Sequence, residues 1–484
     1  MRRGVTGWFE PMSARDAAYI YDEGPGHPEM IIACYLFDAS GEAPVAASSA
    51  QSLRRWVGER LGAADFLTRR IRHVPLEIGL PVWVPAPDLD LDRHVHLHAI
   101  DGGEPELRAM LSEFAATRVD LGGPPWQIHA LVGLRDVDGL DEAVAVVVKV
   151  HHCAADGMAV RTLEAALFSE SSLPDPPARI RPAHPLETTV RGVVGAPWRL
   201  ARFIHRVRST RADAEDVARR TREGLLPAGE AARPTTRFNA PSSGSLHLEL
   251  RTFDHADIRA ARRAVPGATV NDVLLAAVSG ALRRQLAELD ESPEGSLAAM
   301  VPISLRLPDG RTGASRADRT GGGAANQLLL GTIDLHTDLP DPVERLAAIS
   351  MSAADEKARW IDDRVRRAFT RIDASPSWLL ALRGVVRRRT RTGGIAPHTR
   401  LRNTMISNLP APAGAPTFDG APMRASFGVL PVVDGDLLRH LFATLGDRLI
   451  LSVTVDPEVM ADPAHYADLI ADELFVLATA SGPV

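Results

Sequence analysis

The chain has 484 residues, more than one ordinary hydrophobic core holds, so at least two domains are expected. Its 45% hydrophobic and 24% charged residues indicate a globular protein, and a net charge of −6 excludes a general attraction to nucleic acid. Two cysteines, Cys34 and Cys153, exclude a disulfide framework and favour a reducing compartment. No stretch approaches the roughly 18 apolar residues of a transmembrane helix, and the N-terminus lacks the apolar core of a signal peptide. We therefore expect a cytoplasmic protein, soluble or peripheral.

Strands and helices alternate in the first third of the chain. Apolar residues at helical spacing predict helices over 11–23, 46–63, 104–118 and 157–168. Runs of β-branched and apolar residues predict strands over 30–37, 126–132 and 143–150, and residues 69–100 fit short strands and loops. Within that last region His94, His96 and His98 recur at a spacing of two, which would place them on one face of a strand. That face could bind a metal ion or simply lie against solvent.

Prolines between residues 174 and 185 mark a linker, after which the composition changes. Residues 188–224 have a helical pattern in which arginines alternate with apolar residues such as Trp198 and Phe203. A basic amphipathic helix of this kind can lie on an anionic membrane, and it can equally bridge two domains. A second basic segment, 383–391, follows another apolar cluster. The predicted organisation is a first subdomain (1–172), a linker with basic amphipathic helices (173–244) and a second subdomain (245–484).

The second half of the chain again mixes the two element types. Helices are predicted over 255–264, 273–286, 341–358, 359–390 and 462–479. Strands are predicted over 246–250, 298–306, 327–335, 402–407, 425–433, 437–445 and 449–455. The glycine-rich loop 308–325 is not a phosphate-binding loop, because no Gly-Lys-Ser/Thr follows its glycines. Both halves of the chain thus mix strands and helices in similar proportion.

One stretch carries a concentration of reactive groups: His151-His152-Cys153-Ala154-Ala155-Asp156-Gly157. It follows the apolar strand that ends at Val150, where a rigid strand can position side chains and a turn can expose them. The stretch could serve catalysis, bind a metal ion or be structural. Zinc usually takes three or four protein ligands at tight spacing, and no further cluster obviously completes the set. Cys153 is a further candidate nucleophile, although neighbours in sequence rarely face one another.

Several blocks occur in a fixed order along nearly the whole chain. They are Pro11–Ala17, Pro124-Pro125-Trp126, His151–Gly157, Val270-Asn271-Asp272-Val273, Pro302–Arg306 and Ser407-Asn408-Leu409-Pro410. Together they resemble the bacterial wax ester synthase/diacylglycerol acyltransferase (WS/DGAT) family. The heptad also matches the HHxxxDG motif of the wider chloramphenicol acetyltransferase-like superfamily, which includes condensation domains. The resemblance implies an α/β (α+β) fold of two chloramphenicol acetyltransferase-like subdomains, with mixed sheets flanked by helices and an active-site channel between the subdomains.

The resemblance also implies an activity. An acyl-CoA-dependent O-acyltransferase would move a fatty acyl group to a long-chain alcohol or diacylglycerol, giving wax esters or triacylglycerol. His152 would be the general base, because a neutral imidazole with a pKa of about 6.5 can take up the hydroxyl proton at neutral pH. No covalent intermediate would be needed, so no Ser or Cys nucleophile is implied. Acyl-CoA would be a co-substrate, with no cofactor and no metal.

The neighbouring motif residues are expected to support this chemistry. His151 would fix the loop through hydrogen bonds, Asp156 would pair with Arg306, and Gly157 would permit a close approach or an unusual φ. Asn271 either donates a hydrogen bond to the oxyanion or caps its own helix. Candidates for lining the substrate channel are Trp126, Ser407 and Asn408, with core packing as the alternative for Trp126.

The acceptor is the point that the resemblance leaves open. Ala411 stands where the family often has glycine, and residues 321–326 lack the usual Gly-Asn pattern, so a natural product, a sugar or an amine could replace the lipid hydroxyl. A non-catalytic acyl-binding relative is a third interpretation, which the intact His-His-Asp-Gly set argues against. The expected partners are acyl-CoA and the acceptor, with peripheral association at the inner membrane or lipid droplets and no nucleic acid.

Overall fold

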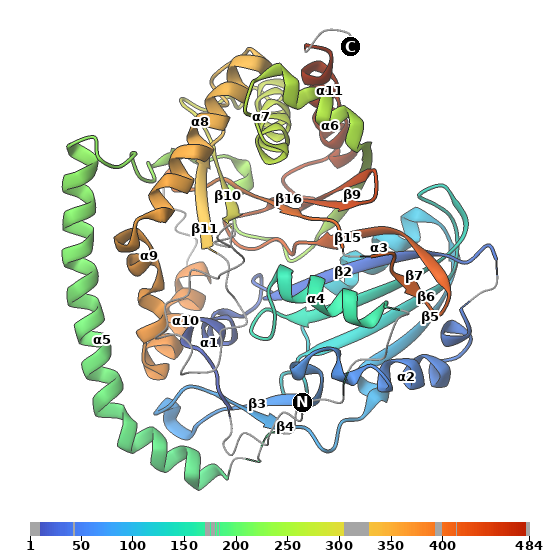
Figure 1. The fold of residues 1–484 in the computed structure, drawn as a ribbon, viewed down its shortest axis with the longest axis vertical. Helices are drawn as coiled ribbons and strands as arrows, with labels where there is room; N and C mark the ends of the chain where they lie inside the picture. Colours follow the sequence, from blue (N-terminus) through green and yellow to red (C-terminus); the bar gives the residue numbers. More distant parts are fainter. Residues whose placement is uncertain are drawn as a thin grey trace.

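Two six-stranded mixed sheets, each covered by helices, form the two halves of the fold (Figure 1). The computed structural model describes residues 10–41, 44–169, 175, 180, 182, 184–303, 329–392, 399–412 and 414–480. The predicted α/β class, with mixed sheets flanked by helices, is confirmed.

The first sheet holds the strand of the histidine motif near its centre. Its order is β14 (Thr417–Phe418), β15 (Ala421–Val429), β2 (Met30–Asp38), β7 (Leu140–His151), β6 (Trp126–Val137) and β5 (Val95–Gly102). Side chains of β2, β6 and β7 alternate between two apolar cores, so both faces of these strands are buried. Helices α2 (Ala50–Gly58) and α4 (Gly157–Leu167) cover one face, while α3 (Glu104–Ala116) and part of the second sheet cover the other.

The second sheet forms the upper half in Figure 1. Its order is β11 (Leu329–Asp334), β10 (Ala298–Ile303), β13 (Thr404–Leu409), β16 (Leu438–Leu445), β17 (Arg448–Val455) and β9 (His247–Asp254). One apolar core joins it to α6 (His255–Ala261), α7 (Val270–Glu288), α8 (Pro342–Ile361) and α11 (Pro463–Thr479). Short strands β1 (Glu10–Pro11), β4 (Val82–Pro85) and β3 (Arg69–Arg72) form a small separate sheet, and β8 (Arg233–Pro234) pairs with β12 (Thr399–Arg400).

The second half of the chain contributes a strand to the first sheet. β15 belongs to the second predicted subdomain by sequence, yet it pairs with β2 of the first sheet, with Ser426 opposite Tyr35. The two halves of the fold therefore do not correspond to two continuous segments of the chain. The predicted strand 425–433 also begins and ends earlier than expected, at 421 and 429, because Ala421 and Pro422 pair with β14 and the pairing with β2 ends at Val429.

Helix α1 (Ala14–Asp22) lies within the predicted range 11–23 and packs beside α10 (Ser377–Thr392). Ser13 caps the helix by accepting a hydrogen bond from the Asp16 main-chain N–H at 3.0 Å. At the other end Asp22 binds both Arg383 and Arg387 of α10. The basic segment predicted over 383–391 therefore uses part of its charge to hold α1 in place.

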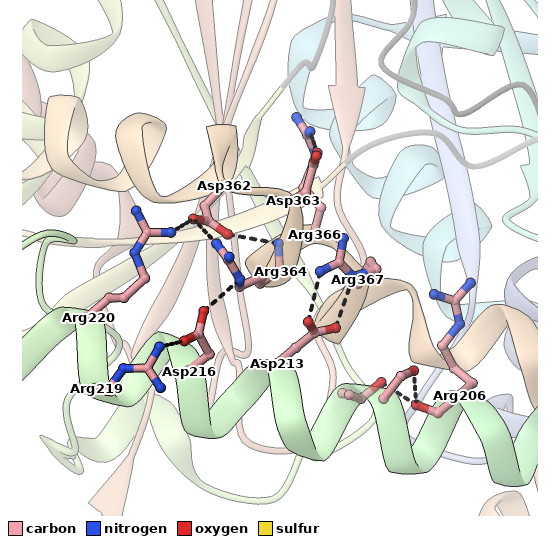
Figure 2. A network of polar contacts seen from close by, with 12 residues as sticks. Arg206, Asp213, Asp216, Arg219, Arg220, Asp362, Asp363, Arg364, Arg366 and Arg367 are labelled. Carbon is pink, nitrogen blue, oxygen red and sulfur yellow. Dashed lines mark hydrogen bonds and ion pairs between the residues drawn. The ribbon is translucent and has the colours of Figure 1, made fainter.

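The basic linker forms one long helix, α5 (Pro185–Arg222), along the edge of the molecule (Figure 1). Its second half is paired with α9 (Asp363–Phe369) through a network of charges (Figure 2). Asp213 accepts two hydrogen bonds from Arg367, at 2.9 and 2.8 Å, and Arg220 pairs with Asp362 at 2.7 Å. These contacts show that α5 bridges parts of the fold, as one of the two predicted alternatives states.

Two smaller predictions need correction. β5 begins at Val95, so His94 precedes the strand and its ring lies against Trp126, at 4.8 Å between centroids. Only His96 and His98 share the strand, so the three histidines do not line one face. The predicted helical stretch 359–390 is divided into α9, a 3-10 segment (Thr370–Ala374) and α10, because Pro376 separates the last two. No helix in the described part of the chain is long and apolar enough to cross a membrane.

Candidate active site

The histidine motif lies where β7 ends and is anchored by the strands on both sides. The main-chain N–H of His151 donates to Pro125 O at 2.9 Å, and that of His152 donates to Glu29 O at 2.7 Å. Ala154 N–H donates back to His151 O at 2.9 Å and closes a tight turn. The positions of both imidazoles are therefore set by the main chain of a central strand and its neighbours.

His151 is fully buried, and its ring helps to shape the turn. Its Nδ1 accepts a hydrogen bond from the Cys153 main-chain N–H at 3.0 Å. In the neutral ring the proton therefore sits on Nε2, which faces Glu23 Oε1 at 3.6 Å. A ring with one nitrogen occupied by its own loop suits the structural role predicted for His151.

His152 is only partly buried, and its ring stacks on that of Tyr19. The two centroids are 4.6 Å apart and the planes differ by 8°. Glu29 lies nearby and is paired with His27, whose Nε2 is 2.9 Å from a carboxylate oxygen. Burial opposes ionisation of Glu29, but the hydrogen bond from His27 and the charges of His27 and His152 lower its pKa. The Glu29 carboxylate is therefore ionised beside the motif.

Asp156 caps the helix that follows the motif. Its carboxylate accepts a hydrogen bond from Ala159 N–H at 2.9 Å, at the N-terminus of α4. Arg306, its predicted partner, lies outside the described residues. The capping contact alone shows that Asp156 organises the loop.

Gly157 brings the second half of the fold to the motif. A Cβ at this position would lie 3.3 Å from Cδ2 of Leu409, at the end of β13, so the close-approach role predicted for glycine fits. The φ of Gly157 is not in the left-handed region, so an unusual φ is not the reason for glycine. The contact places the Ser407–Leu409 strand end beside the loop, with Ser407 buried. Asn408 Oδ1 is buried and has no hydrogen-bond partner in the described structure.

Asn271 lies in the first turn of α7, but other residues cap that helix. Thr269 and Asp272 form a capping box in which each side chain accepts from the other's main-chain N–H, at 3.2 and 2.8 Å. The side chain of Asn271 makes no hydrogen bond with the part of the chain that the structure describes. Asp272, and not Asn271, therefore helps to cap the helix. The oxyanion role of Asn271 stays a prediction.

Trp126 is fully buried at the start of β6, opposite Val150. Its indole N–H donates to Leu67 O at 3.0 Å, and its ring packs in the same core as Val150. These contacts support the packing alternative for Trp126.

Neither a thiol nor a metal fits the motif as the structure describes it. Cys153 is fully buried, and burial, with Asp16 and Glu23 nearby, raises the pKa of its thiol well above the usual value. A thiol in that setting is protonated and unreactive. Among the described residues no group of three or more potential ligands could hold a metal ion.

Tyr19, Glu23 and Glu29 contact the motif and are absent from the sequence-based candidates. Tyr19 and Glu23 are four residues apart on one helix, which is the spacing of a shared face. The helix predicted over 11–23 rests on the spacing of its apolar residues, which does not mark Tyr19 or Glu23. A charged or aromatic residue on a helix does not indicate a functional site by its spacing alone. The segment that packs against that helical face must also be known.

A small pocket lies between segments of the two halves of the fold, and no motif residue lines it. It has a volume of about 80 Å³ and is lined by the turn 24–28, the end of α3 with Arg118, residues 242–246, and Pro431 and Val432. This volume is too small for an acyl-CoA molecule. The predicted active-site channel stays a prediction.

The fold resembles that of several acyltransferases. A wax ester synthase/diacylglycerol acyltransferase from Marinobacter aquaeolei VT8 aligns over 98% of this chain and 100% of its own, with a TM-score of 0.63 and 21% identity. A trichothecene 15-O-acetyltransferase from Fusarium sporotrichioides aligns over 97% and 95%, with a TM-score of 0.58 and 11% identity. The starter condensation domain of rhizomide synthetase, in complex with C8-CoA, aligns over 99% and 98%, with a TM-score of 0.53 and 15% identity. These three structures therefore share the two-sheet α/β fold of this chain.

The sequence comparisons are more specific. The WS/DGAT catalytic domain matches residues 12–274, and the WS/DGAT C-terminal domain matches residues 324–477. A protein of Mycobacterium tuberculosis H37Rv, provisionally named a diacylglycerol O-acyltransferase, is 30% identical over 96% of this chain and 90% of its own. The chain therefore belongs to the wax ester synthase/diacylglycerol acyltransferase family and is an O-acyltransferase, as the sequence motifs predicted.

Proposed function

We propose that this enzyme transfers a fatty acyl group from acyl-CoA to the hydroxyl of a long-chain alcohol or diacylglycerol, forming wax esters or triacylglycerol. The main support is the position of His152: its main chain is fixed by β2, while its ring is only partly buried. The adjacent end of β13 contributes a buried, unpaired acceptor at Asn408, which suits a polar group of a substrate.

In the proposed reaction His152 removes the proton of the acceptor hydroxyl as its oxygen attacks the thioester carbonyl. A carbon–oxygen bond forms and the tetrahedral intermediate carries the negative charge on the former carbonyl oxygen. Collapse of the intermediate breaks the carbon–sulfur bond, and His152 returns its proton to the leaving CoA thiolate. The carboxylate of Glu29 stabilises the imidazolium between these two steps. No acyl-enzyme, metal or further cofactor takes part.

The test measures CoA thiol release with acyl-CoA of several chain lengths against a panel of acceptors. We expect release with fatty alcohol or diacylglycerol and none when His152 is replaced by alanine. His465→Ala is the matched control, because His465 pairs with Glu288 at the surface of α11, away from the motif. Thiol release only with amines, sugars or natural-product alcohols would show that the enzyme acts on a specialised acceptor. No release with any acceptor would favour an acyl-binding role without catalysis.

We also propose that the first half of α5 docks on an anionic lipid surface, such as the inner membrane or a lipid droplet. Its outward side carries exposed apolar side chains at helical spacing: Leu186, Val190, Val193, Val194, Trp198 and Ile204. Trp198 is 74% and Val194 75% exposed. Exposed Arg208 and Arg211 follow at the next turns on the same side of the helix. Their positive charges suit binding to anionic lipid headgroups.

Vesicle flotation with phosphatidylglycerol-containing and pure phosphatidylcholine vesicles tests this surface. The double variant Val194→Glu/Trp198→Glu is expected to lose most of its binding. A variant with the same added charge on the second half of α5, Ala212→Glu/Ala218→Glu, is expected to keep it, because those exposed positions lie beyond the apolar stripe. Equal flotation of both variants and the unmodified enzyme would reject the docking surface.

A further inference from the structure

Helix α1 presents two side chains to the two histidines of the motif. Tyr19 lies against the ring of His152, and Glu23 caps the C-terminal end of the helix opposite the ring of His151. The two are four residues apart, as are side chains on one face of a helix. The histidines are consecutive, so one helical face meets both of them.

Tyr19 forms a parallel stack with His152, with centroids 4.6 Å apart and an 8° angle between the planes. Such a stack restricts rotation of the imidazole about its own axis. Burial, with Glu29 and Asp16 nearby, raises the pKa of the Tyr19 hydroxyl above its usual value. The phenol is therefore neutral at physiological pH, and its ring face can stabilise the positive charge of an imidazolium.

Glu23 lies in a charged setting of its own. Its Oε1 and the Nε2 of His151 are both buried, face one another at 3.6 Å, and have no hydrogen-bond partner in the described structure. The other oxygen of Glu23 is 4.0 Å from Arg118. A small inward movement of either side chain would complete a hydrogen bond to the proton-bearing nitrogen of His151.

The helix that carries these residues is held from the second half of the fold. Arg15 pairs with Asp373 at 3.0 Å, and Asp22 binds Arg383 of α10. Gly384 lies so close to Tyr21 O that a Cβ there would clash with it, at 2.1 Å. The face of α1 is thus fixed against the motif by contacts from both ends.

We propose that α1 is the positioning element of the active site: Tyr19 sets the plane of the His152 ring and stabilises its protonated form, and Glu23 holds His151 in place beside it. This inference rests on the proposed role of His152 as general base. Tyr19 and Glu23 are positioning residues, because they act through the histidines.

Paired substitutions at Tyr19 provide the test. Tyr19→Leu removes the aromatic face and should lower kcat about 5- to 30-fold while leaving the KM for acyl-CoA unchanged. Tyr19→Phe keeps the stack and should retain kcat within about threefold. Tyr19→Met, whose flexible side chain refills the space, replaces the leucine variant should that one fail to fold.

Tyr21→Phe is the matched control on the same helix. It removes hydroxyl contacts with Ser377, at 2.7 Å, and with Glu77, which hold α1 but do not touch the motif. It should lower Tm and leave kcat unchanged. For Glu23, Glu23→Gln should retain more activity than Glu23→Ala, because the amide oxygen can accept the hydrogen bond that a small movement toward His151 would form.

The outcomes separate this inference from the proposed function. Loss of turnover in His152→Ala together with normal kcat in Tyr19→Leu would overturn the positioning role alone. Normal turnover in His152→Ala would overturn the general base itself. An equal loss of kcat in Tyr19→Phe and Tyr19→Leu would assign the effect to the hydroxyl and reject the stack.

Discussion

The first sheet carries two groups of histidines on neighbouring strands. One is the motif pair at the end of β7, and the other is formed by His96 and His98 of β5 with His129 of β6. In this second group, the β5–β6 cluster, His98 Nε2 is 3.1 Å from His129 Nδ1, and the His129 ring stacks on Phe114 at 4.1 Å. The rings of the cluster face each other and an apolar neighbour.

The difference lies in what surrounds each imidazole. Burial, the two neighbouring histidines and Lys149 lower the pKa of His129 to about 2, so its ring is neutral and cannot take up a proton at physiological pH. The motif pair has carboxylates close by, Glu23 at His151 and Glu29 near His152. Clustered histidines in mid-strand thus serve packing, whereas histidines at a strand end, beside carboxylates, are suited to proton transfer.

The same substitution in both groups gives the largest expected contrast. His152→Gln should lower kcat about 100- to 10,000-fold, the usual contribution of a general base, because glutamine cannot take up a proton. His129→Gln should leave kcat within about threefold, since it lies in the β5–β6 cluster away from the reacting groups. Thiol-release kinetics measure kcat of both variants. A comparable loss of kcat in the two would contradict the difference in role between the motif pair and the β5–β6 cluster.

Low pH should lower the stability of the protein through the β5–β6 cluster. The folded-state pKa of His129 lies far below the usual value of 6.5, so the unfolded chain binds more protons between these two values. Stability is fully present above pH 6.5 and falls as pH drops below it, with a slope of up to about 1.4 kcal/mol per pH unit for this group. Urea unfolding of the enzyme and of His129→Phe at several pH values measures it. The variant should show the shallower slope, and identical slopes would contradict the assignment.

Asp156 ranks next in expected effect. Asp156→Ala removes the cap of α4 and should lower the free energy of unfolding by about 1 kcal/mol, whereas Asp156→Asn keeps a capping oxygen and should lower it less. Thermal unfolding compares the two. Equal Tm values for the alanine variant and the unmodified enzyme would show that the cap does not stabilise the loop.

Metal ions should have the smallest effect. Addition of zinc or of a chelator should leave Tm and turnover unchanged, because no group of potential ligands in the described structure meets the requirements of a metal site. A rise in Tm with zinc that disappears in His98→Gln would instead make the β5–β6 cluster a metal site.

The sequence predicted what is local. The β-branched run of β7 and the order of motif blocks led to the strand, the histidine turn and the family. The arginine pattern of α5 predicted a helix, with membrane binding and bridging as equal alternatives. Contacts between distant segments could not be predicted. The stack of Tyr19 on His152 joins residues more than a hundred positions apart, and the capping of α7 by Asp272 depends on which of two adjacent polar residues faces the main chain.

Because β15 comes from the second half of the chain, the first sheet cannot be completed by the first half alone. β2 has nine residues and pairs with β7 on one side and with β15 on the other. A fragment ending before the linker would leave this central strand as an open, apolar edge, which is prone to aggregation. The first half is therefore expected not to refold as an independent module, because its sheet is complete only when the last quarter of the chain has been synthesised.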